Sequence, residues 1–130
     1  MLRIIISSHG NLCNEIKNTV EMFSGEIDNC YTVPLLTGQS IDDFESKMNG
    51  LVEKFDLNDE LIIVTDLRGG TPYNIGIKTL FGREKTWVIS GMNVPMLLSI
   101  AMRDDDEDID EMISNSIDQS IEGIEVKSKS

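Results

Sequence analysis

The chain has 130 residues, the length of one ordinary domain, and its hydrophobic (40%) and charged (26%) fractions are those of a globular protein. Its formal net charge of −12 argues against binding to nucleic acid or to anionic lipid, because such a surface repels both. No apolar stretch approaches membrane-spanning length, and the N-terminus lacks the plan of a signal peptide. We therefore expect a cytoplasmic protein.

Apolar, β-branched runs alternate with segments of helical periodicity along the chain. Strands are predicted over residues 2–7, 30–36, 60–65 and 85–90. Pro34 places the second of these strands at a sheet edge. Residues 124–127 alternate like a half-exposed strand. No linker or repeat interrupts the pattern, so residues 1–130 are expected to form a single domain.

Helices are predicted in the intervals between the strands and after the fourth strand. Their starts are indicated by residues that cap helices: Asn11, Ser40, Thr71 followed by Pro72, and Asn93. A fifth helix is predicted from the apolar spacing of residues 109–121. Strands separated by such helices require crossover connections, hence a parallel sheet covered on both faces. We predict a three-layer α/β/α fold with a four-stranded sheet of order 2-1-3-4.

The only histidine of the chain, His9, follows the first predicted strand, and Asp66 follows the third. These strands are neighbours in the predicted order, so the two side chains should face each other in the crevice where open α/β sheets bind ligands. Behind Asp66, Gly69 and Gly70 lead into the helix start at Thr71. Glycines allow close approach of the backbone, and the free N–H groups of a helix start attract an anion.

This combination fits phosphoryl transfer to and from His9. A neutral imidazole can attack phosphorus with one ring nitrogen, while a carboxylate accepts the N–H of the other and fixes the tautomer. Asp66 is the candidate for that carboxylate, and backbone donors at Gly10, Gly70 and Thr71 could hold the phosphoryl oxygens. Each residue alone also has an ordinary structural explanation; their coincidence at one crevice favours function.

Other chemistries have less support in the sequence. Cys13 and Cys30 form no metal-binding motif. The acidic run 103–111 lacks the central glycine and the spaced closing glutamate of a calcium loop, so we interpret it as a solvated loop leading into a helix. There is no Walker lysine motif and no GxGxxG. No metal or cofactor is therefore predicted. A thiol hydrolase using Cys13 with His9 remains open, because a cysteine in the first turn of a helix favours the thiolate.

Three segments, SHG (8–10), TDLRGGTPYN (65–74) and SGMNVPML (90–97), occur in an order that resembles the IIA component of the mannose-type bacterial sugar phosphotransferase system, the family for mannose, fructose, sorbose and N-acetylgalactosamine. The resemblance implies a phosphotransferase that takes a phosphoryl group from HPr onto Nε2 of His9, while Asp66 holds the other ring nitrogen. The group then passes to a IIB component and, through the membrane components IIC and IID, to sugar.

The resemblance also implies a homodimer with a C-terminal antiparallel edge strand, exchanged between subunits and here near residues 124–127. IIA and IIB are often fused in this family; from this chain we expect a separate IIB protein. Leu67 occupies a position where some relatives carry a hydroxyl residue, which leaves Thr71 as the side-chain donor to phosphate. The alternative is a regulatory or dihydroxyacetone-kinase-linked phosphotransfer domain of the same fold.

Overall fold

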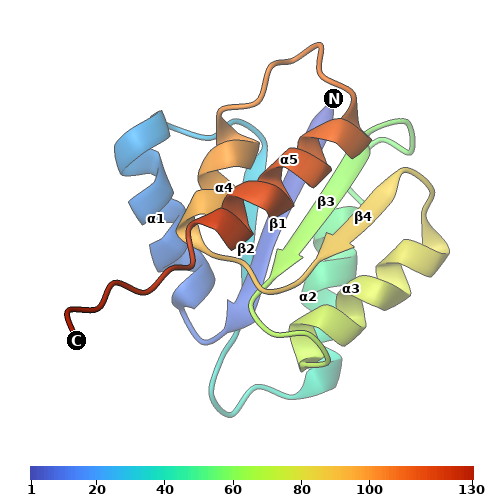
Figure 1. Ribbon diagram of the computed structural model, residues 1–130. Coiled ribbons are helices and arrows are strands. Elements are labelled where there is room, and N and C mark those ends of the chain that lie inside the picture. The colour runs from blue at the N-terminus through green and yellow to red at the C-terminus, as the bar shows by residue number, and fades with distance from the viewer.

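A computed structural model describes residues 1–130 and shows one sheet between two layers of helices (Figure 1). The strands are β1 (Leu2–His9), β2 (Cys30–Leu35), β3 (Glu60–Thr65) and β4 (Thr86–Ile89), all parallel in the order β2-β1-β3-β4. The predicted fold class and strand order are confirmed. Pro34 lies in β2, which is an edge strand. The lack of an N–H at Pro34 costs the sheet no hydrogen bond on the outer side of β2, because no strand lies there.

Both faces of the sheet are buried, which explains the continuous apolar runs of the strands. Helices α1 (Leu12–Ser24), α4 (Val94–Ala101) and α5 (Ile109–Glu122) cover one face, and α2 (Ile41–Val52) and α3 (Thr71–Gly82) cover the other (Figure 1). Alternate β1 residues serve the two layers: Ile4 and Ile6 pack beneath α1 and α4, and Ile5 packs with Phe44 of α2. The acidic run forms the exposed loop before α5, as predicted.

Two of the predicted helix caps, Ser40 and Asn93, are confirmed with their side-chain hydrogen bonds. Asn11 is the N-cap of α1 but lacks such a bond, and Thr71 is wrong as a cap. The side chains of Ser40 and Asn93 accept the N–H groups of Asp43 and Met96, at 3.1 and 3.0 Å. Asn11 makes no capping bond; the hydroxyl of Ser8, at the end of β1, accepts the Cys13 N–H instead (2.8 Å). Thr71 is already the first residue of α3, and the N-cap is Gly70.

Residues 124–130 extend away from the rest of the chain without regular secondary structure (Figure 1). Ile124 is 74% exposed and Val126 is 87% exposed. The predicted C-terminal edge strand is therefore not present in the single chain, because these residues have no strand beside them. None of the helices combines the length and the apolar character needed to cross a membrane.

Candidate active site

His9 and Asp66 meet at the ends of two adjacent strands, as the sequence predicts. β1 continues further than expected, so His9 is its last residue, and Asp66 directly follows β3. The Nδ1 atom of His9 lies 3.0 Å from Oδ2 of Asp66. The same Oδ2 accepts the backbone N–H of His9 at 2.9 Å, a contact that the sequence did not indicate. One carboxyl oxygen thus holds both the ring and the backbone of the histidine.

The Asp66 carboxylate is fixed in an ionised state. Its Oδ1 accepts the N–H of Leu67 at 2.9 Å. Burial raises the pKa of Asp66, but the hydrogen bonds from the His9 amide and ring outweigh this effect and hold that pKa below its usual value. An ionised carboxylate only accepts hydrogen bonds, so Nδ1 of His9 carries a proton. In the neutral ring, Nε2 then has the free lone pair and is the nucleophilic nitrogen.

Of the predicted phosphate-binding residues, Gly10, Gly69 and Gly70 lie in the loops that follow β1 and β3, and Thr71 is the first residue of α3. Their amides differ. The N–H of Gly10 donates to the carbonyl of Leu35 (2.7 Å), and that of Gly70 donates to the carbonyl of Leu67 (3.1 Å). The N–H groups of Gly69 and Thr71 donate to no backbone carbonyl. Gly69 and Thr71 are therefore the members of this set whose amides can receive an anion in the present geometry.

Ser8 is a residue of the site that sequence reasoning missed. Besides accepting the Cys13 N–H, its hydroxyl donates to the carbonyl of Gly10 at 3.0 Å. The side chain thereby joins the end of β1 to the first turn of α1 and fixes the loop that follows His9. The spacing gave no signal for this contact, because Ser8 lies three residues before the N-cap Asn11.

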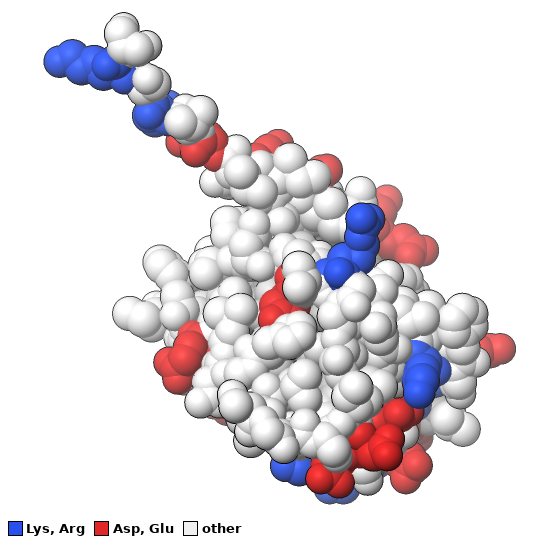
Figure 2. All heavy atoms as spheres, turned by 90° about the horizontal axis from the view of Figure 1, so that it is seen from below, with Lys and Arg blue, Asp and Glu red and all other residues white.

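The surface around His9 is open. The His9 side chain is 46% exposed, and exposed leucines follow the first three strands at this end: Leu12, Leu36 and Leu67. Figure 2 views the molecule from the end where the strands finish and shows a largely uncharged face with a few acidic and basic groups, despite the net charge of −12. Such a surface suits contact with another protein better than enclosure of a small molecule.

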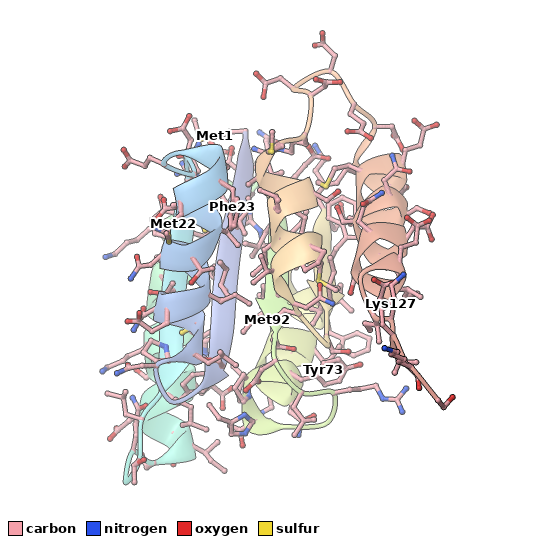
Figure 3. The ribbon with its side chains drawn as sticks, turned by 60° about the vertical axis from the view of Figure 1, so that its left-hand side comes forward. Met1, Met22, Phe23, Tyr73, Met92 and Lys127 are labelled. Atoms are coloured by element: carbon pink, nitrogen blue, oxygen red, sulfur yellow. The ribbon has the colours of Figure 1, made fainter.

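The largest groove, of about 560 Å³, lies elsewhere, between α1, α4 and α5, and contains neither His9 nor Asp66. Phe23 of α1 lines it. In Figure 3, Phe23 lies toward the upper end of α1, whereas Tyr73 from the first turn of α3 lies toward the lower end, where the strands finish. The groove is thus separate from the His9 site.

The cysteine alternative loses its support. Cys13 is completely buried, and burial raises the pKa of its thiol despite several hydrogen bonds that act in the opposite direction. A protonated, inaccessible thiol is not a nucleophile at neutral pH. No group of histidine, cysteine and carboxylate side chains is arranged to hold a metal ion.

Comparison with known proteins agrees with the geometry. The family model EIIA-man, described as PTS system fructose IIA component, matches residues 3–117. The chain belongs to this family. Members of the family are phosphotransferase components of sugar phosphotransferase systems.

The relatives share modest identity with this EIIA family member. The mannose-specific EIIAB component of Escherichia coli K12 is 30% identical over 124 residues, which is 95% of this chain and 38% of the relative, so the chain spans about two fifths of that protein. The fructose-specific EIIA component of Bacillus subtilis is 29% identical over 77% of this chain and 68% of its own length. The crystal structure of an EIIA component from Streptococcus agalactiae superposes with a TM-score of 0.86 at 30% identity and covers 97% of both chains.

Proposed function

We propose that residues 1–130 form one IIA domain that acts as a phosphocarrier of a sugar phosphotransferase system. It accepts a phosphoryl group from HPr on His9 and passes it to a IIB component. The observation that carries this proposal is the 3.0 Å contact between Nδ1 of His9 and Asp66, which leaves Nε2 with a lone pair at an exposed surface. Membership of the EIIA-man family supports the same role.

In the transfer step, the Nε2 lone pair of His9 attacks the phosphorus carried by HPr. The new N–P bond forms as the bond between phosphorus and its HPr donor atom breaks, and that bond's electron pair stays with HPr. The proton on Nδ1 remains in place, and the Asp66 carboxylate stabilises the positive charge that develops on the ring. The amides of Gly69 and Thr71, together with the Thr71 hydroxyl, are proposed to donate to the phosphoryl oxygens.

The return step is the reverse reaction with a different partner. A nucleophilic histidine of IIB attacks the phosphorus, the N–P bond to His9 breaks, and the ring regains its lone pair. Both partners must reach the same nitrogen in turn, which fits the open, charge-poor surface around His9 and its exposed leucines. The sugar and the membrane components IIC and IID would act downstream of IIB, and HPr, IIA and IIB would meet in the cytoplasm.

We further propose that the protein is a homodimer in which residues near Ile124–Lys127 pair as an antiparallel edge strand with the partner subunit. Two features support this: the apolar side chains of the extended tail are exposed, and the outer edge of β4 has no neighbouring strand in the single chain. Light scattering should give the mass of two chains for residues 1–130. A chain that ends at Gly123 should give the mass of one.

The test of the phosphocarrier role uses phosphoenolpyruvate, Enzyme I and HPr with the purified protein. We expect a mass gain of one phosphoryl group that is labile in acid and stable in alkali, as phosphohistidine is. Addition of a IIB protein should remove it. His9→Ala should abolish the gain, whereas the matched variant Cys13→Ala should retain it. The proposal would be overturned if the wild-type protein were not labelled, or if Cys13→Ala lost the label while His9→Ala kept it.

A further inference from the structure

We infer that Gly70 is a positioning residue for His9, and that it acts by having no side chain. A Cβ atom placed on Gly70 would lie 2.6 Å from Cε1 and 3.3 Å from Nε2 of the His9 ring. Contacts of 2.6 Å do not occur between carbon atoms of a relaxed structure. The imidazole therefore occupies space that any other residue at position 70 would fill.

The backbone does not explain why this position is glycine. Gly70 has φ −75° and ψ 169°, a conformation open to every residue type. Its neighbour Gly69 is the opposite case: φ is +84°, in the left-handed region, and a Cβ there would meet nothing within 4 Å. Of the two glycines after Asp66, Gly69 allows the left-handed backbone of the turn, and Gly70 leaves the space that the His9 ring occupies.

Neither the His9 ring nor the Gly70 backbone can move away from this contact without breaking a hydrogen bond. The ring is held on its other edge by Oδ2 of Asp66. The backbone of Gly70 is held by two hydrogen bonds, one from its N–H to Leu67 and one from the Asn74 N–H to its carbonyl (2.9 Å). Since the His9 ring is nearly half exposed, it is the part that moves most easily. A side chain at position 70 should push the ring outward, off Asp66.

Displacement of the ring has a chemical consequence. The hydrogen bond to Asp66 is what keeps the proton on Nδ1, because the tautomer of a histidine is set by the bond that the other nitrogen makes. Once that bond is broken, Nε2 carries the proton in part of the population and cannot attack phosphorus. Gly70 thereby sets the fraction of molecules in which Nε2 is a nucleophile. This last step rests on the proposed phosphocarrier role, whereas the position of the ring does not.

The first experiment reads the ring directly and needs no partner protein. His9 is the only histidine, so the ¹⁵N signals of its ring are unambiguous in Gly70→Ala. We expect the Nδ1–H tautomer in the wild-type protein and a mixture in the variant. Gly50→Ala is the matched control, since Gly50 lies in α2 with open space around its Cβ position, and it should retain the wild-type signals. A wild-type tautomer in Gly70→Ala would overturn the inference.

The second experiment removes the opposing side of the contact. In the His9→Ala background the ring is absent and only the Leu67 carbonyl remains close, 3.3 Å from the Cβ position. Gly70→Ala should therefore lower the urea midpoint much less in this background, where the restriction of the unfolded chain by alanine offsets part of the loss. In the wild-type background the same substitution should lower the midpoint. If Gly70→Ala alone fails to fold, the double variant should recover folding. An equal change in both backgrounds, or a double variant that also fails to fold, would contradict the inference.

The phosphorylation assay links the ring to the transfer step. From HPr, Gly70→Ala should be labelled about 10²-fold more slowly than wild type, the scale expected when a residue that orients a reactive ligand is lost. Gly50→Ala should be labelled at the wild-type rate. If the wild-type protein accepts no phosphoryl group, the phosphocarrier role fails. The ring measurements would still decide whether Gly70 positions the His9 ring. Full-rate labelling of Gly70→Ala would refute the inference alone.

Discussion

The two ends of β3 carry the same arrangement with different partners. Asp59 directly precedes β3 and Asp66 directly follows it. Each carboxylate contacts a side-chain nitrogen of a residue in the neighbouring strand β1. Asp59 lies 3.1 Å from Nε of Arg3, and Asp66 lies 3.0 Å from Nδ1 of His9. The same pairing of parallel strands thus places a carboxylate beside a basic side chain twice.

The difference lies in what the basic side chain can still do. Arg3 also donates to Asn29 and Tyr31, and its guanidinium lies 5.0 Å from the centre of the Phe55 ring. An arginine stays protonated at all ordinary pH values, so this pair has one state. His9 keeps a free nitrogen and is 46% exposed. The same geometry thus gives a fixed ion pair at the arginine end. At the histidine end it leaves an accessible ring nitrogen, the one that we propose carries the phosphoryl group.

The largest effect should come from removing the two bases. His9→Ala should abolish acceptance of phosphate from HPr and change the free energy of unfolding by less than about 1 kcal/mol, because the ring is partly exposed. Arg3→Met should do the reverse: full labelling with a lower midpoint in urea. Labelling by mass spectrometry and unfolding followed by circular dichroism measure the two properties. Loss of labelling in a folded Arg3→Met protein would break the comparison.

Removing the two carboxylates should produce a smaller difference between the two ends of β3 than removing the two bases. Asp66→Ala should slow labelling of His9 by about 10²-fold, since the ring loses the group that fixes its tautomer and stabilises its charge. Asp59→Ala should be labelled at the wild-type rate. Quenched-flow labelling with phosphorylated HPr measures both rates. An Asp66→Ala protein that is labelled at full speed would remove the aspartate from the proposed mechanism.

The contrast between the two ends also marks how far the sequence could be interpreted. Alternation of strands and helices predicts a parallel sheet, and the commonest strand order of small sheets of this kind, 2-1-3-4, brings His9 to Asp66. The pairing of Arg3 with Asp59 was not predicted, although Arg3 lies in β1 and Asp59 directly precedes the neighbouring strand β3. Its prediction needs the register, in which Arg3 stands opposite Leu61. Register is set by how the side chains pack, and an apolar strand buried on both faces shows no alternation that would reveal it.

Hydrogen-bond assignments within the site were beyond the sequence for a related reason. Each residue carries one amide donor whatever its type, so the letters GG do not show that the Gly70 amide is already used and the Gly69 amide is free. The Ser8 cap was missed because its hydroxyl reaches α1 from within a strand. The tail over residues 124–127 has the alternation of a strand, but a strand also requires a neighbour, and in the single chain the tail extends away from the sheet (Figure 1).

A smaller effect should appear in stability. Asp59→Asn should lower the melting temperature more than Asp66→Asn does, because Asp59 contacts two positive charges, the Arg3 guanidinium at 3.1 Å and the N-terminal ammonium at 3.6 Å. The partners of Asp66 are an amide and a ring that water can reach. Differential scanning calorimetry at pH 7 measures both variants, with Asp43→Asn on exposed α2 as the control. Equal losses for the two variants would mean that the positive charges beside Asp59 do not distinguish the two ends.

The smallest effect concerns acid. Burial raises the pKa of Asp59, but the hydrogen bond and charge of Arg3 and the N-terminal ammonium outweigh it, so this pKa, like that of Asp66, lies below its usual value. Carboxyls of this kind release protons more readily in the folded state. Their stabilisation is fully present above the unfolded pKa of about 3.9 and is lost as pH falls through the lower folded pKa.

The urea concentration at the midpoint of unfolding, measured from pH 6 down to pH 2, should therefore decrease once the pH is below about 4. Asp59→Asn and Asp66→Asn should each flatten part of that decline. The remainder should include Glu21, whose pKa is lowered chiefly by the Ile27 N–H against the opposing effect of burial. A decline unchanged in Asp66→Asn would show that the histidine end carries no such linkage. In that case the Asp66 carboxylate would fix the ring without being stabilised by it, and only the arginine end would contribute to the loss of stability in acid.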